Sequence, residues 1–520
     1  MRELFKLFFP NINSFRSVIN ETDNTSISRE RFIDFLKTSG LLLLVINSFL
    51  FLTVTKSGGE YIISNLSTTS ESFMTISWFT IGMSLFIFSM GFNNLIAWYS
   101  NVGRDGSQWN YLVDRINTLL GPVIVWIFSS TIVLNILSRS ENFPNYLTTS
   151  EDGIMPSIEF ILWPLWLVSI YLVMVLFAPF TIYLHKKYPY ATVLTLTTLT
   201  VLIDNINFSL SFSYIKLFNY LFFWIVIHQI GYFFADGKIQ KVKFSVFRYI
   251  TVFTYGYLFY QMSVSESYLS LASYRLTSFN NEDPPTTIYL IASIGLICLF
   301  LSVRNFIENI LANQKLWLII SHIHSNIYTI YLWHLFVFFI IYLFGLNMYY
   351  TPLLLLITAF IFGSYERNMF KLSSNLVKRV NPLQPWPSPI KARFSINNFA
   401  LAWFSALLIL LGVIHLTLGG IGQDGFFTIR EFYFLRSNTF EGLGRIFIGL
   451  LLLNITVRGL KYKKRILAGS ILFVLFTLYT RNIINENLTS FEIYFASITI
   501  ALFSLILVQN SNYKQKTKVQ

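Results

Sequence analysis

Long apolar segments, separated by shorter polar ones, run along the whole chain. Many approach roughly 20 residues, the length with which a helix crosses a bilayer, and they lack the short alternating pattern of barrel strands. The pattern predicts an all-α fold, a polytopic membrane helix bundle. We expect about fourteen membrane helices, at roughly 39–55, 73–98, 117–137, 158–182, 191–204, 218–236, 245–262, 286–302, 327–344, 351–363, 399–418, 444–457, 465–479 and 491–508.

Charge and proline divide the chain into five parts. Residues 1–36 are a polar cytoplasmic lead, and residues 37–363 hold ten helices as a membrane core. Residues 364–398 form a basic cytosolic linker, in which closely spaced prolines exclude a helix: Pro382, Pro385, Pro387 and Pro389. We expect a four-helix C-terminal membrane unit over 399–508 and a cytoplasmic tail over 509–520.

The distribution of charge adds a direction to this picture. The 520 residues are 54% hydrophobic and only 12% charged. With the N-terminus in the cytoplasm, about four in five of the 38 lysines and arginines fall on the cytoplasmic side, as the positive-inside rule requires. We therefore expect a multi-pass protein of the plasma membrane with both termini cytoplasmic.

The net charge of +13 is explained by this bias and needs no nucleic acid. The basic loops are expected to contact anionic lipid head groups. A site for an anionic cytosolic substrate is the second interpretation of these loops.

A polar stripe leads into the first apolar segment. Arg31, Asp34 and Lys37 recur every three residues before it, and Asn47 and Ser48 interrupt it. At 100° per residue Ser48 lies about 20° from Lys37 around a helix, so the charges and Ser48 share one face. Polar residues inside a membrane helix indicate a functional site by default. The alternative is a set of snorkelling side chains that anchor the helix at the cytoplasmic surface.

Two histidines fall inside apolar helices. His228 and His334 are each expected roughly 10–12 Å deep from the cytosolic side, and Ser48 about 15 Å deep. One interpretation is a single cavity open to the cytosol, in which a histidine is a general base toward a hydroxyl. The alternative, favoured slightly for His228, is that each histidine hydrogen-bonds a neighbouring helix and only stabilises the bundle. The others are expected in cytosolic surface loops (His185, His322, His324) or packed or interfacial near a helix end (His415).

No familiar cofactor motif is present in the sequence. It contains no phosphate-binding loop, zinc-ligand spacing, nucleophile elbow or dinucleotide fingerprint, so neither a metal nor a tightly bound cofactor is expected. The single cysteine, Cys298, cannot form an intrachain disulfide. Small residues in the second apolar segment instead predict close helix packing: Gly82, Ser84, Ser89 and Gly91.

Several motifs occur in a set order between residues 29 and 363: Arg31-x-x-Asp34-x-Leu36-Lys37, Gly82–Asn93, Arg115–Pro122, Pro164–Leu167, Val226–Tyr232 with Asp236-Gly237, Asn281–Thr286 and Tyr331–His334. Together they resemble integral-membrane acyltransferase family 3. The resemblance implies a core of ten helices. It also implies transfer of an acyl group, often acetyl, from cytosolic acyl-CoA to a hydroxyl of a carbohydrate, lipid or other cell-envelope acceptor.

This resemblance implies roles for the polar residues. Arg31, Lys37 and Arg115 would bind the phosphates of acyl-CoA, the co-substrate, because cationic side chains bind phosphate well. Asp34 would orient the basic residues. Lys37 stands where the family usually has arginine.

The chemical step implied by the resemblance is a base-assisted attack on a thioester. His334, or less securely His228, would deprotonate the acceptor hydroxyl, and Asn47 or Ser48 would donate a hydrogen bond to the oxyanion. The family's usual catalytic histidine lies in the first helix, where this chain has Asn47 or Ser48. The alternative function is that of a non-catalytic relative: a transporter, a lipid- or acyl-binding module, or an assembly partner. Nothing in the sequence gives an oligomeric state.

Overall fold

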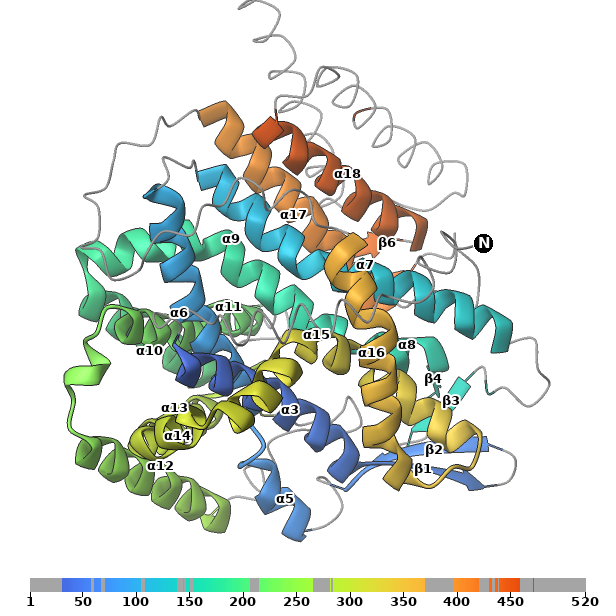
Figure 1. Cartoon of the computed structure of the whole chain (residues 1–520), viewed down its shortest axis with the longest axis horizontal. Coiled ribbons are helices and arrows are strands. Elements are labelled where there is room, and N and C mark those ends of the chain that lie inside the picture. Colours follow the sequence, from blue (N-terminus) through green and yellow to red (C-terminus); the bar gives the residue numbers. More distant parts are fainter. Residues whose placement is uncertain are drawn as a thin grey trace, which may run out of the picture. The chain divides into compact units, whose positions relative to one another are not determined.

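The computed structural model describes residues 30–57, 60–66, 71–103, 108–137, 144, 146–149, 154–205, 215–264, 281, 284–369, 396–419, 430–432, 435–437, 439–458 and 471 (Figure 1). The chain divides into two compact units. The first unit comprises Met1–Ser100, Leu120–Ser157 and Phe177–Pro385. The second unit comprises Asn101–Leu119, Ile158–Leu176 and Trp386–Gln520.

The all-α membrane fold predicted from the sequence is confirmed. Each of the first twelve predicted segments contains a helix: α3 (Arg31–Phe51), α5 (Glu71–Ser77) with α6 (Gly82–Val102), α7 (Gln108–Leu137), α8 (Ser157–Leu162) with α9 (Leu165–Lys187), α10 (Pro189–Asn205), α11 (Asn219–Ala235), α12 (Phe244–Val264), α13 (Thr287–Ser302), α15 (Gln314–Leu343), α16 (Thr351–Met369), α17 (Ile396–Gly419) and α18 (Thr439–Arg458). A further helix, α14 (Arg304–Ala312), was not predicted. The helices predicted over 465–479 and 491–508 lie outside the described residues, apart from residue 471.

Within the described part of the chain, five helical stretches are long and apolar enough to cross a membrane: Arg31–Phe51, Ser72–Val102, Phe160–Lys187, Ile215–Ala235 and Gln314–Leu343. A sixth is formed by α13 and α14 together, which are bent by 53°. The predicted total of fourteen spans stays a prediction. So do the predicted lead, linker and tail, most of which lie outside the described residues.

The first predicted helix, 39–55, is wrong at both ends. The helix begins at Arg31, so that the charged residues and the apolar segment form one continuous helix, and it ends at Phe51. Residues 52–55 are strand, and Thr53 to Thr55 are β-branched, which favours an extended backbone. They belong to a sheet of order β1-β2-β3-β4: β1 (Leu52–Ser57), β2 (Glu60–Asn65), β3 (Tyr146–Thr149) and β4 (Ile154–Pro156).

Glycines bring neighbouring helices of the first unit into backbone contact. A Cβ built on Gly40 of α3 would lie 2.6 Å from the carbonyl oxygen of Gly82 on α6. A Cβ built on Gly231 of α11 would lie 3.0 Å from the Cα of Gly91, also on α6. Neither crossing has room for a larger side chain, so the close packing predicted for the small residues of α6 is confirmed.

The second unit contains an antiparallel helix pair, α17 and α18. A Cβ on Gly412 would lie 2.6 Å from the carbonyl oxygen of Gly442, and one on Gly449 would lie 2.6 Å from that of Ser405. His415 is buried in the same crossing, where its ring faces Gly442. The prediction of a packed histidine at position 415 is therefore confirmed. In the segment that connects these helices, two short strands pair with each other: β5 (Arg430–Phe432) and β6 (Leu435–Ser437).

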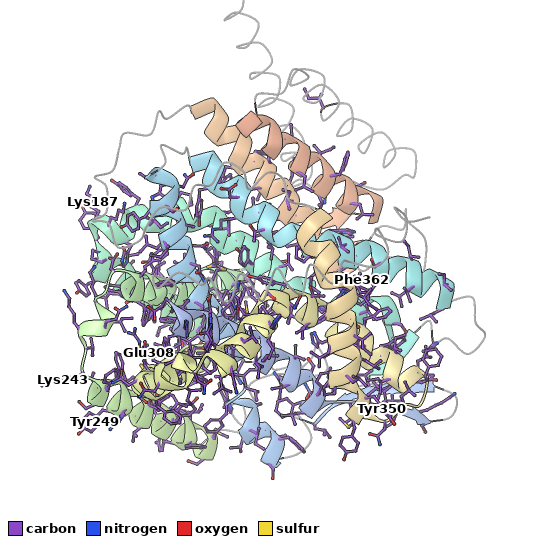
Figure 2. All side chains as sticks on the ribbon, in the orientation of Figure 1. Lys187, Lys243, Tyr249, Glu308, Tyr350 and Phe362 are labelled. Carbon is purple, nitrogen blue, oxygen red and sulfur yellow. The ribbon has the colours of Figure 1, made fainter. Side chains whose placement is uncertain are left out.

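An outer face of the first unit is apolar, as expected of a surface in contact with lipid. On α12, Tyr249, Val252 and Phe253 are 75%, 72% and 76% exposed, and Tyr249 is labelled in Figure 2. Water solvates such a continuous apolar face poorly, whereas acyl chains solvate it well.

Candidate active site

The helices α3 and α15 pack against each other and run in the same direction. Partners on α15 follow the order of the residues on α3, from the Arg31–Trp317 pair at one end to the Ser48–His334 pair toward the other. Parallel packing is what the first and ninth spans of an alternating series require. The two helices therefore bring together residues from the start and the end of the predicted core.

Ser48 and His334 form a buried hydrogen bond between these helices. The Ser48 Oγ lies 3.1 Å from Nε2 of His334, and the two residues are only 5% and 3% exposed. The other ring nitrogen, Nδ1, is hydrogen-bonded to the backbone carbonyl of Tyr331. Because a carbonyl only accepts, Nδ1 carries the proton of the neutral imidazole and Nε2 accepts. The Ser48 hydroxyl therefore donates to His334, as a nucleophile donates to its base.

The charged end of the stripe begins with Arg31. Its Nη1 donates to the carbonyl of Leu311 at 2.7 Å, in the last turn of α14, and its guanidinium lies 4.9 Å from the centre of the Trp317 ring. A cation at a helix C-terminus satisfies free carbonyls and complements the helix dipole. Six residues further along α3, the Lys37 ammonium lies 4.6 Å from the centre of the Tyr328 ring. Both cations are thus held at this end of the stripe.

Asp34 lies between these cations and faces a histidine. Its Oδ1 lies 3.4 Å from Nε2 of His324, whose Nδ1 lies 2.9 Å from the hydroxyl of Thr38. The sequence pattern predicts His324 on a surface loop together with His322. That prediction is wrong, because α15 begins at Gln314 and both histidines are helical; His324 packs against α3.

A further charged group adjoins this end of α3. Arg304 lies 3.4 Å from the carboxylate of Glu30 and donates to that of Glu308 at 2.6 Å. Burial raises the pKa of Glu30; Arg304 offsets part of this effect, whereas Glu308 and Asp34 add to it. The Glu30 carboxyl is therefore protonated more readily than that of an exposed glutamate.

Asn47 and Ser48 both stand where the family resemblance expects a histidine, but they face different neighbours. Ser48 faces His334, whereas Asn47 is half-exposed and its side chain has no hydrogen bond to the part of the chain that the structure describes. Successive residues point about 100° apart around a helix. The predicted stripe of Arg31, Asp34, Lys37 and Ser48 is therefore observed: all four face α14 or α15, and Asn47 lies beside it.

The family comparison agrees with this arrangement. A profile described as an acyltransferase domain matches residues 30–365, more than half of the 520-residue chain. The chain belongs to acyltransferase family 3. The match begins one residue before α3 and ends within α16, so it contains the whole α3–α15 pair. Searches of curated proteins and of solved structures gave no match.

The second candidate base of this acyltransferase family member, His228, belongs to a different helix pair. Its Nε2 lies 3.0 Å from the amide nitrogen of Asn94 on α6, which donates to it. Its ring meets that of Tyr232 edge to face at 4.8 Å. No hydrogen bond joins His228 to His334 in the described structure. These are the contacts of a histidine that links two helices, and a catalytic role for His228 stays a prediction.

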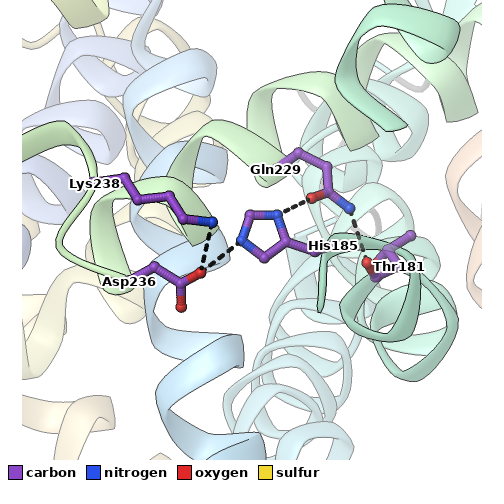
Figure 3. A network of polar contacts seen from close by, with 5 residues as sticks. All are labelled: Thr181, His185, Gln229, Asp236 and Lys238. Carbon is purple, nitrogen blue, oxygen red and sulfur yellow. Dashed lines mark hydrogen bonds and ion pairs between the residues drawn. The ribbon is translucent and has the colours of Figure 1, made fainter. Parts of the chain in front are cut away.

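His185 was missed by sequence analysis, which expected it in a cytosolic surface loop. That expectation is wrong because α9 continues to Lys187, beyond the predicted end at 182, and packs His185 against α11. Its Nδ1 lies 2.9 Å from Oε1 of Gln229 and its Nε2 lies 3.0 Å from Oδ2 of Asp236 (Figure 3). The Gln229 amide is oriented by its own donation to the Thr181 carbonyl at 3.0 Å.

Both ring nitrogens of His185 therefore face oxygen acceptors, which suits an imidazolium that donates from each. Lys238 also approaches Asp236, at 3.3 Å, because Gly237 with φ 73° turns the chain back at the end of α11. Burial raises the pKa of Asp236. The hydrogen bond and charge of His185, with a smaller contribution from Lys238, together lower this pKa by more than burial raises it, so the net shift is downward. The Asp236-Gly237 motif was visible in the sequence, but its partner on α9 follows from no fixed spacing.

Arg115 lies on α7, in the second compact unit, and is half-buried. Arg31 and Lys37 lie in the first unit. The predicted role of Arg115 in binding donor phosphates therefore stays a prediction.

Proposed function

We propose that this protein is a membrane O-acyltransferase. It transfers an acyl group, expected to be acetyl, from cytosolic acyl-CoA to a hydroxyl group. The acceptor is a carbohydrate, a lipid or another component of the cell envelope. The reaction takes place in the plasma membrane, in a multi-pass protein surrounded by membrane lipids, with both termini in the cytoplasm.

The observation that carries this proposal is the hydrogen bond from Ser48 to His334. It supports a neutral histidine whose unprotonated Nε2 already accepts a hydroxyl hydrogen bond, as the base of an O-acyl transfer must. The Tyr331 carbonyl fixes the ring and the tautomer. Membership of acyltransferase family 3 supports acyl transfer as the reaction for this base.

The charged end of α3 supports a thioester donor that carries phosphates. Arg31 and Lys37 are held by aromatic rings and by a helix end, and each cation can still attract an anion. Asp34, through His324, fixes the stripe against α15. A donor bound here would place its phosphates near the start of α3 and extend its thioester along the stripe toward Ser48.

In the chemical step His334 accepts a hydroxyl proton at Nε2 while the hydroxyl oxygen attacks the thioester carbonyl. The amide of Asn47, one residue from Ser48 at the edge of the stripe, is the candidate donor to the oxyanion. His334 then gives its proton to the leaving thiolate. The Nδ1–H···O=C bond to Tyr331 persists throughout and stabilises the protonated ring.

The test is release of CoA from labelled acetyl-CoA by the purified full-length protein in nanodiscs, with a membrane extract as acceptor. His334→Ala is expected to reduce release by about 10²–10⁴-fold, the range of general-base catalysis. His415→Ala, which removes a buried histidine from the second unit, is the matched control and should retain activity. Undiminished release by His334→Ala would refute the assignment of the base. A wild-type protein that releases no CoA would favour a non-catalytic relative instead.

A further inference from the structure

We propose that Ser48 is itself acylated, and that the acyl group passes from the donor thioester to Ser48 and then to the acceptor. This inference rests on the proposed acyltransferase function and specifies its route. It assigns to Ser48 the role of nucleophile, in place of hydrogen-bond donor to the oxyanion.

The geometry of His334 leads to this route. Its unprotonated ring nitrogen, Nε2, already accepts a hydrogen bond from the Ser48 hydroxyl at 3.1 Å. A hydroxyl of another molecule can be deprotonated there only after it displaces Ser48. Both side chains are almost fully buried, where α3 packs against α15. The hydroxyl nearest to the base is therefore the first to be activated.

The immediate surroundings of Ser48 fit a nucleophile that must lose and regain a proton. Its hydroxyl has a second acceptor, the Leu44 carbonyl at 3.2 Å, to which it can turn whenever Nε2 is protonated. Tyr331 holds the opposite side of the ring in one tautomer. The hydroxyl contacts the base and the base contacts an orienting carbonyl, as in an activated nucleophile, with a neutral carbonyl where a carboxylate often stands.

The first half-reaction acylates Ser48. The hydroxyl proton moves to Nε2 of His334 as a bond forms between Oγ and the thioester carbonyl carbon. The tetrahedral intermediate then collapses, the carbon–sulfur bond breaks, and the thiolate of CoA takes the proton from Nε2. The products are free CoA and a serine ester.

The second half-reaction frees Ser48. With Oγ esterified, Nε2 has lost its hydrogen-bond donor and can accept one from an acceptor hydroxyl. The acceptor oxygen attacks the ester carbonyl while its proton moves to Nε2. The bond between the acyl carbon and Oγ breaks, and Ser48 recovers the proton. Donor and acceptor therefore need not occupy the site together.

A second hydroxyl–histidine pair on the same helices provides an internal contrast. The Thr38 hydroxyl lies 2.9 Å from Nδ1 of His324 but 2.7 Å from the carbonyl of Asp34. The other nitrogen of His324 faces the Asp34 carboxylate. The Thr38 hydroxyl lies closer to a backbone carbonyl than to its histidine, whereas the Ser48 hydroxyl lies slightly closer to His334, at 3.1 Å, than to the Leu44 carbonyl, at 3.2 Å. Thr38 is therefore not expected to be acylated.

The experiment uses the purified full-length protein in nanodiscs and radiolabelled acetyl-CoA without acceptor, followed by an acid quench. We expect label on the protein in a peptide that contains Ser48, with the mass of one acetyl group and the alkali sensitivity of an ester. Ser48→Ala and His334→Ala should lose the label. Ser48→Cys should convert it to a thioester that neutral hydroxylamine cleaves. The matched control that keeps the label is Ser89→Ala, which removes a buried hydroxyl that donates to a helix carbonyl at 2.8 Å.

The outcomes separate the route from the overall function. If Ser48→Ala releases CoA at the wild-type rate in the presence of membrane extract and no label appears on the wild type, the covalent route is overturned and the acyltransferase function stands. If the wild type neither releases CoA nor takes up label, both are overturned. Label on the wild type that chases into the extract, and that Ser48→Ala abolishes in folded protein, supports the covalent route.

Discussion

The Thr38 hydroxyl lies 2.9 Å from Nδ1 of His324, at a sequence separation of 286, the same separation that joins Ser48 to His334. Two hydroxyl–imidazole contacts therefore repeat at one offset along α3 and α15. A repeated offset fixes the register of two parallel helices, because a shift by one residue would separate both pairs. The site at Ser48 consequently depends on the packing of α3 along its whole length.

The packing of α3 against α6 should be intolerant of a single methyl group. A Cβ on Gly40 would meet the Gly82 carbonyl at 2.6 Å, so Gly40→Ala should push the helices apart and destabilise the protein by about 1–3 kcal/mol. We expect a lower unfolding temperature in detergent and reduced CoA release. Gly256→Ala is the control, because nothing lies within 4 Å of its Cβ; an equal effect of both substitutions would contradict the steric argument.

The Arg31 cation should strengthen binding only of acyl donors that carry phosphates. Arg31→Gln is expected to raise the KM for acetyl-CoA by about tenfold, the effect of losing one charge-assisted contact of about 1.4 kcal/mol. The kcat should change little. Acetyl-pantetheine, which has no phosphate, should show no such difference between the variant and the wild type. The exposed Arg248 provides a control as Arg248→Gln, and a raised KM for acetyl-pantetheine would show that Arg31 acts through the fold instead.

The hydrogen bond between His228 and Asn94 should contribute to the free energy of unfolding and not to the chemical step. His228→Leu leaves the Asn94 amide buried without this partner, and we expect a loss of about 1–3 kcal/mol in stability. The double variant His228→Leu/Asn94→Leu should recover part of that loss, because both polar groups are then removed. Thermal unfolding of the four proteins of the cycle measures the coupling. A loss of kcat in folded His228→Leu, without loss of stability, would instead support a catalytic role.

Asp236 should contribute stability that disappears in acid. Its pKa is lowered in the folded protein from an ordinary value of 3.8, so its contribution is fully present above that value and is lost as pH falls through the folded pKa. Asp236→Asn should therefore be less stable near pH 7, by about 1–3 kcal/mol, and the difference from wild type should shrink below pH 3.8. Unfolding measured across pH tests this.

The control for Asp236 is its second partner. Lys238→Gln should have a smaller effect, because its side chain is 37% exposed and solvent screens the pair. A difference between Asp236→Asn and wild type that does not vary with pH would assign the effect to packing rather than to charge.

The sequence was sufficient to predict the polar stripe of α3, because helical rotation alone places Arg31, Asp34, Lys37 and Ser48 on one face. It also predicted the family and the close packing of α6. It could not decide between Asn47 and Ser48 as the residue opposite His334, because that choice depends on which face of α3 meets α15. Contacts between helices that are far apart in the chain produce no fixed sequence spacing from which they could be predicted.

The errors have local physical causes. Leu52 and Val54 follow Phe51 without a charge, so hydropathy extends the helix into β1; only the β-branched residues at 53–55 indicate a strand. His185 lies among basic residues at the end of an apolar segment, as a surface histidine would, but α9 continues past it. Its partners, Gln229 and Asp236, are supplied by α11 and could not be inferred from the neighbours of His185 in the chain.

The separation of 286 residues between Ser48 and His334 has a consequence for biosynthesis. The ribosome completes α3 long before α15, so the first helix must enter the membrane with its polar face not yet matched. A nascent chain that ends before α15 has the seryl hydroxyl but no base, and it has no α15 residue to pair with Asp34. The proposed site therefore forms only when α15 is in place, because α15 supplies the partners of both Ser48 and Asp34.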